Sequence, residues 1–413
     1  WGADQLMANV LRNPGLEAIH DGALVVVAQS DGTSVVDDTP WTARAAGFWG
    51  GAQFTVLSGA ATGQTGRVVD DRPVKPGGAT QLWLNPMPQG VGPGDVVALE
   101  GQQDPAAVPL WWTRGHVRND TAQRRPNSPG QQSVRLVALP RQDAALIHHL
   151  DGITPRAGKL LPVEGAWRLS FWVKGESRSA RMRIHFARQG SRPWVDQPLS
   201  PKPEWQQVVI EFEAHDNGPV GPLALTLQVE AGEVLIDDVE LGERLPGAGG
   251  FRQTVVDTLT ALRPGYLRDW QGQLADTPAN RGAEAFARHP VRYRPGEHEA
   301  HFMYSTSAFL ALCASVGARP WVILPATSTP TQAKEFGRQL AQAWARHHFD
   351  EIVVEYGNEH WNSLFRPAGV ASAKTLGPMA DRLYAALREG AGPSVPLHWV
   401  LGAQYVNPNN TRD

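Results

Sequence analysis

Polar and apolar residues alternate along much of the chain up to residue 243, and this pattern predicts β-strands. The alternation is clearest in WRLSFWV (167–173), ARMRIHF (180–186) and LALTLQV (223–229). Turns rich in Gly, Pro and Asp separate such runs. Strands at this spacing favour an antiparallel β-sandwich, which we expect to span residues 7–45 and 109–243.

Residues 46–108 interrupt this pattern with shorter apolar runs and Gly-rich turns such as GPGD. They predict a small inserted β domain. The segment SGAATGQTG is Gly-rich like a phosphate-binding loop, but no GK[ST] follows it and no helical pattern begins after it. We therefore assign the insertion no chemistry.

The apolar period becomes that of helices from residue 245 onward. Successive units read as an amphipathic helix, a Gly or Pro turn and a short apolar strand. The strands are expected at 266–268, 321–324, 352–354 and 398–401. Helix–strand units in series indicate a parallel α/β structure, and we expect part of a (β/α)8 TIM-type barrel over 245–413. In such a barrel the residues after each strand form the catalytic face.

A dense group of polar and aromatic residues directly follows the strand expected at 352–354. The group contains Tyr356, Asn358, Glu359, His360 and Trp361, and we expect Tyr356 to be one of the substrate-binding residues. A carboxylic acid in aromatic, partly dry surroundings keeps its proton near neutral pH, as a general acid must. Glu359 is therefore a candidate catalytic acid, the alternative being a salt-bridged or N-capping carboxylate. His360 and Trp361 are either walls of a sugar subsite or packing within the loop.

The composition is that of a globular protein, with 42% hydrophobic residues, 19% charged residues and a net charge of −3. No electrostatic footprint for nucleic acid is visible, and no apolar run approaches the roughly 18 residues of a membrane span. Cys313 is the only cysteine, which excludes an internal disulfide. The 15 Trp residues suit stacking on sugars or filling β cores. For Trp111, Trp112 and Trp194 we expect core packing, the alternative being stacking on a glycan.

Five segments in the first part follow one another in the order of a known jelly roll. They are NVLRNPGLEA (9–18), QQSVRLVA (131–138), WRLSFWVKGE (167–176), WQQVVIEFEA (205–214) and EVLIDDVEL (233–241). This part resembles the carbohydrate-binding modules of families 4 and 9. The resemblance implies a polysaccharide or oligosaccharide as partner.

Such modules often hold a structural calcium ion, and the resemblance points to Asp237, Asp238 and Glu17 as ligands. Oxygen ligands of this kind suit Ca²⁺. The alternative is a set of paired edge carboxylates without a metal. No cofactor is otherwise expected.

The second part carries three motifs in a fixed order: TALRPGYLRDW (260–270), ALCASVGARPW (311–321) and the strand-end sequence GNE (357–359). With them the chain resembles a clan A glycoside hydrolase and is most similar to family 51, the α-L-arabinofuranosidases. The resemblance implies that Glu359 is the general acid/base, that Asn358 contacts the sugar 2-hydroxyl, and that Arg268 lies near the nucleophile. For Arg268 the alternative is an internal ion pair with Asp269 or Asp276.

The sequence departs from the family pattern at several points. Asp269, Trp270 and Gln271 stand where the family has Pro-Gly-Gly, and we expect Trp270 and Gln271 to face substrate. Ala308 stands where the family has Glu. Tyr405 and Asn407, after the last expected strand, are further substrate-binding candidates.

The segment from residue 245 is also shorter than the roughly 250 residues of a full barrel. We therefore expect the nucleophile to lie outside this chain and a further chain or segment to complete the barrel. The chain begins at Trp1, which fits either removal of a signal peptide or trimming. A secreted or periplasmic, extracellular location is expected. The predicted function is that of a secreted retaining glycoside hydrolase. The alternative is a non-catalytic glycan-binding or polysaccharide-assembly protein on a degenerate barrel.

Overall fold

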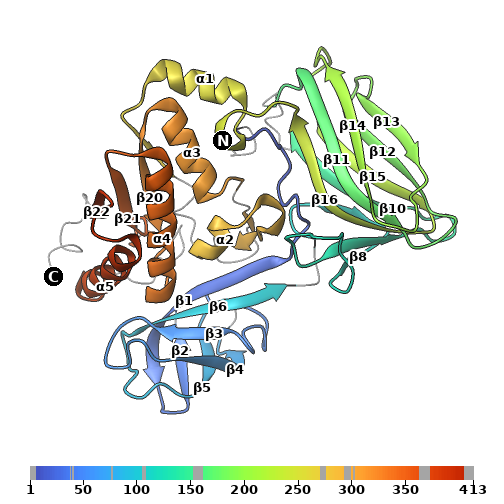
Figure 1. Cartoon of the computed structure of the whole chain (residues 1–413). Coiled ribbons are helices and arrows are strands. Elements are labelled where there is room, and N and C mark those ends of the chain that lie inside the picture. Colours follow the sequence, from blue (N-terminus) through green and yellow to red (C-terminus); the bar gives the residue numbers. More distant parts are fainter. Residues whose placement is uncertain are drawn as a thin grey trace.

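The computed structural model describes residues 6–37, 39, 41–75, 78–104, 108–151, 161–269, 276–292, 299–300, 303–361 and 373–403. The molecule is rich in β-structure and has a small closed barrel, a β-sandwich and an α/β part (Figure 1). No helix in these ranges is long and apolar enough to cross a membrane.

Six antiparallel strands close the small barrel in the order β1-β2-β5-β4-β3-β6. They are β1 (Ile19–Ser30), β2 (Ser34–Asp37), β3 (Gln53–Val56), β4 (Thr65–Pro73), β5 (Thr80–Asn85) and β6 (Val96–Asp104). Its core packs around Trp41, Trp49 and Phe54. The small barrel begins at β1, so residues 19–37 pair within it rather than in the sandwich, to which we had assigned them. Alternation reveals that a segment is a strand, but it does not reveal which sheet the strand joins.

Two five-stranded antiparallel sheets form the sandwich, as the alternation predicted, in the orders β13-β12-β15-β10-β7 and β14-β11-β16-β9-β8. The strands are β7 (Trp112–Arg114), β8 (His116–Asp120), β9 (Ser133–Val137), β10 (Ala144–Asp151), β11 (Gly165–Gly175), β12 (Arg181–Arg188), β13 (Val195–Leu199), β14 (Gln206–Ala214), β15 (Leu223–Ala231) and β16 (Glu233–Glu243). Inward-facing residues of both sheets, such as Trp167, Phe171 and Phe186, make one apolar core.

The α/β part contains a parallel sheet in the order β17-β20-β21-β22. Its elements are α1 (Gln253–Leu262), β17 (Tyr266–Arg268), α2 (Pro278–Gly282), β18 (Val291–Arg292), β19 (Glu299–Ala300), α3 (Thr306–Val316), β20 (Arg319–Leu324), α4 (Pro330–His347), β21 (Ile352–Tyr356), α5 (Ala373–Ala391) and β22 (Leu397–Leu401). Short 3-10 turns cover Ala248–Gly250 and Ala285–Ala287. All four predicted parallel strands are confirmed. Within the described residues they form an open sheet, with β17 and β22 at its edges.

Local sequence signals fix where the helices that flank these strands begin and end. The hydroxyl of Ser305 caps the start of α3, and Gly317 ends it in the left-handed conformation. Thr329 and Gln332 form a capping box at the start of α4, with Pro330 in the first turn. These signals hold the loops at both ends of β20 at a defined length and so fix the position of its carboxyl end.

The small barrel packs against the α/β part. Leu24, Val96 and Ala98 of the small barrel belong to the same apolar cluster as Leu324 and Ala326 at the end of β20. The amide of Gln332, in the first turn of α4, donates a hydrogen bond to Glu100 of β6. Because α4 follows β20, the small barrel lies at the carboxyl-end rim of the parallel sheet.

Candidate active site

Four side chains from three neighbouring strands meet at the carboxyl-end rim of the parallel sheet. Arg268 ends β17, and its Nε and Nη2 donate to the two carboxylate oxygens of Glu355 on β21, at 2.9 and 3.0 Å. Nη2 also donates to Oδ1 of Asn358, at 2.7 Å. Trp321 of β20, which lies between the two strands, donates its indole N–H to Glu355 at 2.8 Å. The Arg268 guanidinium stands over the Trp321 ring, 5.8 Å from its centroid. The result is a hydrogen-bonded network around a buried carboxylate.

The partner of Arg268 is therefore neither Asp269 nor Asp276, the ion-pair alternatives considered from the sequence. Asp269 is buried against Arg281 and accepts a hydrogen bond from the Tyr304 hydroxyl at 3.1 Å. Asp276 is buried too, and it accepts a hydrogen bond from the Asn280 amide at 2.7 Å. Burial raises the pKa of Asp276 to about 7.

Glu355 is the residue that inspection of the sequence missed. It sits inside an otherwise apolar and aromatic run, IVVEY, and both of its neighbours on the strand are buried. A carboxylate within a buried strand requires a partner. That signal was available from the sequence, but it does not identify Arg268, which lies 87 residues away.

A tight turn carries Asn358 and Glu359 out of β21. Gly357 has φ of 60°, and its N–H donates to the Leu324 carbonyl at 2.8 Å. Glu359 itself has φ of 39°, which is uncommon for a residue with a side chain. Strained backbone of this kind persists where the surroundings enforce it and clusters at functional sites. Asn358 is buried in this turn and Glu359 is half-buried.

His360 and Trp361 follow Glu359 and pack edge to face, with ring centroids 4.9 Å apart. His360 is buried, and burial lowers its pKa to about 4, so its imidazole is neutral at physiological pH. Among the described residues its Nδ1 has no hydrogen-bond partner. A neutral ring with a buried nitrogen suits an acceptor or donor for a ligand hydroxyl.

Tyr356 is a core residue, which corrects its prediction as a substrate-binding side chain. It is 1% exposed and its ring meets Tyr384 of α5 edge to face, 6.4 Å away. Successive residues of a strand point to opposite faces. Since Glu355 points toward Arg268, Tyr356 must point toward the helix layer. The predicted substrate-binding residues Trp270, Gln271, Tyr405 and Asn407 lie outside the described residues.

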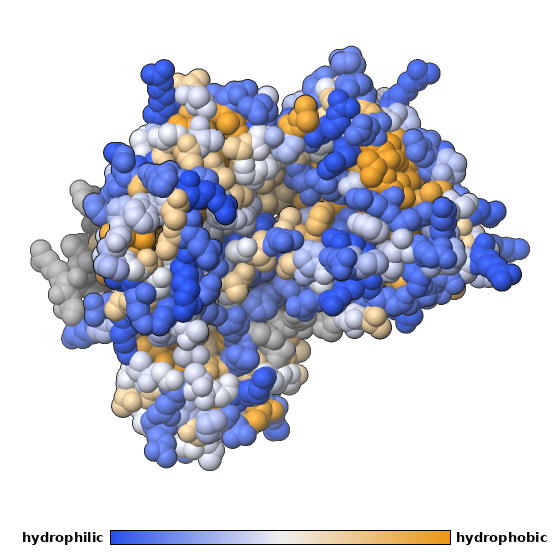
Figure 2. Space-filling model, in the orientation of Figure 1, coloured by the Kyte–Doolittle hydropathy of each residue, from blue (hydrophilic) through white to orange (hydrophobic). Residues whose placement is uncertain are grey.

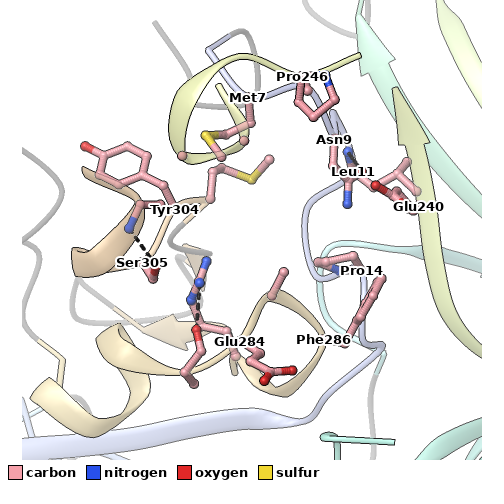
Figure 3. Close-up of a pocket in the computed structure, with 18 of the residues that line it drawn as sticks. Met7, Asn9, Leu11, Pro14, Glu240, Pro246, Glu284, Phe286, Tyr304 and Ser305 are labelled. Atoms are coloured by element: carbon pink, nitrogen blue, oxygen red, sulfur yellow. Dashed lines mark hydrogen bonds between the residues drawn. The ribbon is translucent and has the colours of Figure 1, made fainter. Parts of the chain in front are cut away.

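Two hollows are lined by described residues other than Glu359, and one of them reaches Arg268. An apolar groove of about 490 Å³ runs along α1 and α3 and reaches Leu267 and Arg268 of the edge strand β17. Apolar surface is visible over the sandwich and near α1 (Figure 2). A second cavity, of about 410 Å³, lies between the sandwich and the α/β part (Figure 3). Its labelled lining includes Asn9, Glu240, Phe286, Tyr304 and Ser305.

The three carboxylates predicted to bind calcium are buried in the sandwich near one another. Glu17 Oε2, Asp237 Oδ1 and Asp238 Oδ1 are buried and accept no hydrogen bond from a described residue. Burial raises the pKa of Glu17 to about 7, and burial with mutual repulsion raises the pKa of Asp237. Burial also raises the pKa of Asp238, although Arg125 opposes the shift. Within the described ranges, no group of three His, Cys, Asp or Glu side chains is spaced to hold a metal ion.

Comparison with known proteins gives a likeness in structure only. No protein-family model matches the chain, and no curated protein matches it. An arabinose-bound GH51 α-L-arabinofuranosidase aligns with 72% of this chain and 53% of its own, at 12% identity and a TM-score of 0.51. The chain thus spans about half the length of that enzyme and shares its fold over the aligned part. A family 61 carbohydrate-binding module with β-1,4-galactotriose aligns with 33% of this chain and 90% of its own, at 20% identity and a TM-score of 0.24.

Proposed function

We propose that this chain carries the acid/base half of a retaining glycoside hydrolase that acts on a polysaccharide or its side chains, outside the cytoplasm. The observation that carries the proposal is the placement of Glu359. It leaves β21 in a strained turn directly after Asn358, whose amide is hydrogen-bonded to Arg268 from β17. The fold shared with an α-L-arabinofuranosidase supports the same class of chemistry.

In the first step, Glu359 gives its proton to the glycosidic oxygen as the bond to the anomeric carbon breaks. A second carboxylate, roughly 5 Å away, bonds to that carbon from the opposite face. In the second step, Glu359 takes a proton from a water molecule, whose oxygen displaces the enzyme carboxylate. Asn358 would donate a hydrogen bond to a sugar oxygen, while His360 and Trp361 would line the same subsite.

The nucleophile would come from outside this chain, on a further segment or chain that completes a (β/α)8 barrel. The open edges of the parallel sheet support this. Tyr266 on β17 is 45% exposed, and Leu401 on β22 is also 45% exposed. Added strands along β17 and β22 would cover these side chains and satisfy the edge backbone groups. The sandwich would serve as a carbohydrate-binding module.

Calcium is a further part of the proposal. Glu17, Asp237 and Asp238 each have a buried oxygen without a hydrogen bond from a described residue, and such oxygens suit Ca²⁺. These side chains would have to move to bring the oxygens around an ion, because as they stand the described residues contain no group of three such side chains spaced to hold one. The ion would neutralise buried charge in the sandwich and take no part in the reaction.

A second candidate function, glycan binding without hydrolysis, is favoured by Trp112. Its side chain is 61% exposed on the outer face of the sandwich, whereas Trp111 is buried. Trp112 pairs with Ile147, and the row continues across the sheet through Thr226 and His185. An exposed indole on the same face of a sheet as hydroxyl and imidazole groups suits stacking and hydrogen bonding to a sugar.

The test of the main proposal is hydrolysis of aryl glycosides by the full-length protein and its Glu359→Gln variant. Loss of a general acid costs about 10²–10⁴ in rate, most of all for a poor leaving group. The matched control is Glu351→Gln, since Glu351 precedes the same strand at the opposite end of the sheet. Unchanged turnover in Glu359→Gln would remove Glu359 from the mechanism. Glycan-array binding without any product by mass spectrometry would favour the second candidate.

A further inference from the structure

We propose that Glu355 is a positioning residue that fixes the direction of the Asn358 amide beside Glu359, so that the site presents N–H donors to a ligand oxygen. The proposal rests on the proposed function for its catalytic consequence, but its structural content stands independently. Glu355 touches no reacting atom in this account, because it acts through Arg268.

Three N–H groups hold the Glu355 carboxylate. Oε2 accepts from Arg268 Nε at 2.9 Å and from Trp321 Nε1 at 2.8 Å, while Oε1 accepts from Arg268 Nη2 at 3.0 Å. The Glu355 side chain is 8% exposed and that of Arg268 is 30% exposed. A two-pronged pair of this kind fixes the plane of the guanidinium as well as its distance. The indole on the strand between them fixes the carboxylate in turn.

The plane of the guanidinium then determines the orientation of Asn358. Nη2 carries two hydrogens; one is donated to Glu355 and the other to Asn358 Oδ1, at 2.7 Å. Arginine has donors and no acceptor. A flipped Asn358 would place its NH₂ group against these donors, so the chemistry excludes that orientation. The Nδ2 group must therefore point away from Arg268.

The consequence is a selective contact next to the proposed acid. No described residue accepts a hydrogen bond from Asn358 Nδ2, whose two hydrogens are left for a ligand. The ligand atom that they meet must be an acceptor, such as a sugar hydroxyl or ether oxygen. A protonated amine at the position of that acceptor would bring its own N–H donors against those of Asn358. The two sets of donors would repel each other and the buried donors would lack an acceptor, so the amine would be rejected.

Side-chain NMR on the full chain tests the orientation without requiring activity. In the wild type, the Arg268 Nε–H proton should resist exchange with water at neutral pH. The two protons of the Asn358 side-chain NH₂ group should give one resolved pair of signals. Glu355→Gln should let the Arg268 Nε–H proton exchange with water. It should also shift the signals of the Asn358 NH₂ protons and of the Trp321 indole N–H. The control Glu351→Gln should leave all three signals unchanged; Glu351 likewise accepts a hydrogen bond, from the Tyr266 hydroxyl, and it lies against His398.

Trp321→Phe is the second variant, in case Glu355→Gln does not fold. It removes one of the three bonds to Glu355 and should shift the same Arg268 and Asn358 signals by a smaller amount. Asn358 signals that are unmoved in both folded variants would overturn the proposal, whatever the outcome for Glu359.

Kinetics then separate positioning from a general structural effect. With a nitrophenyl glycoside that the wild type hydrolyses, Glu355→Gln should lower kcat/KM by about 10- to 100-fold. With the 2-deoxy analogue, which lacks the accepting oxygen, the same variant should lose less than about threefold, since the Asn358 contact is already absent. Equal losses on both substrates would show that Glu355 acts only on stability and would overturn the positioning role.

Discussion

Arg268 and Glu355 form a two-pronged ion pair that spans three strands of the parallel sheet. Arg268 ends β17 and Glu355 lies on β21, with β20 between them, so the arginine reaches across two strand spacings of about 4.8 Å each. Trp321 of the middle strand adds a third bond to the same carboxylate. The carboxyl ends of the three strands are thereby tied together at the point where Glu359 leaves the sheet.

Removing Arg268 should therefore destabilise the protein strongly. We expect Arg268→Ala to lower the free energy of unfolding by about 3 kcal/mol, because it leaves the Glu355 carboxylate buried without its main partner. The matched control is Arg338→Ala, which breaks an exposed pair with Glu335 on the surface of α4 and should cost less than about 0.5 kcal/mol. Urea denaturation of both variants measures the difference. Equal losses would mean that the Arg268–Glu355 pair contributes no more than a surface pair.

The turn after β21 should tolerate only glycine at position 357. Gly357 has φ of 60°, and an added Cβ would lie 3.2 Å from the Ala326 methyl group. Gly357→Ala should cost about 1–2 kcal/mol and should displace Asn358 and Glu359, lowering any hydrolytic rate with them. Gly265→Ala is the control, since Gly265 directly precedes β17 with open space around it and does not have a left-handed φ. That control should change the free energy of unfolding by less than about 0.5 kcal/mol in thermal or urea unfolding. A stable, fully active Gly357→Ala protein would contradict the role given to this turn.

Calcium should change how stability depends on pH. Burial raises the pKa of Glu17 from 4.5 to about 7, so the folded protein holds a proton there that the unfolded chain has released. In a chelator, stability should therefore fall as the pH rises from about 4.5 to about 7. Millimolar Ca²⁺ should suppress this fall, because it replaces the proton as the neutralising charge.

Glu17→Gln serves as the control for the calcium measurement. Its side-chain carbonyl can still accept the hydrogen bonds that Gln131 and Gln132 donate to Glu17, at 2.9 and 3.4 Å. The variant should show a smaller pH dependence and a smaller response to Ca²⁺ in thermal unfolding. A melting temperature near pH 7.5 that is the same with Ca²⁺ and with chelator would exclude the calcium site.

Glycan binding by the sandwich should depend on Trp112. Trp112→Ala should leave the melting temperature within about 2 °C of the wild type, since the side chain is 61% exposed. It should weaken retention on immobilised polysaccharide by about fivefold or more, in line with the loss of one stacking contact. Val209→Ala removes an exposed apolar side chain from the other sheet and should leave retention unchanged. Unaltered retention by Trp112→Ala would place the glycan elsewhere.

The strands of the α/β part could be predicted well from the sequence, because residues next to each strand determine where it begins and ends. Gly or Pro shortly precedes β17, β20 and β22, and the apolar runs of β20 and β21 are short and rich in β-branched residues. The alternating strands of the sandwich were found for a similar reason. The extent of the small barrel was not predicted correctly, because β1 pairs with β6, a strand that lies far along the chain.

The candidate site was predicted only in part, because one of its contacts joins residues that lie far apart in the sequence. Glu359, Asn358 and Arg268 could be named from motifs, but the Glu355 carboxylate that joins two of them is a long-range partner. Tyr356 was assigned to the wrong face, although the alternation of a strand would have corrected it once Glu355 was placed at the site. Sequence order shows which residues follow a strand; pairing across strands determines which of them meet.

The measurement that tests the central claim most directly is the leaving-group dependence of hydrolysis by the full-length protein and its Glu359→Gln variant. A series of aryl glycosides with increasing leaving-group pKa should give a shallow slope for the wild type, because Glu359 supplies the proton. The variant should retain much of its rate on the best leaving group and lose about 10²–10⁴ on the worst. A uniform loss across the series, or none, would contradict the assignment of Glu359 as the proton donor.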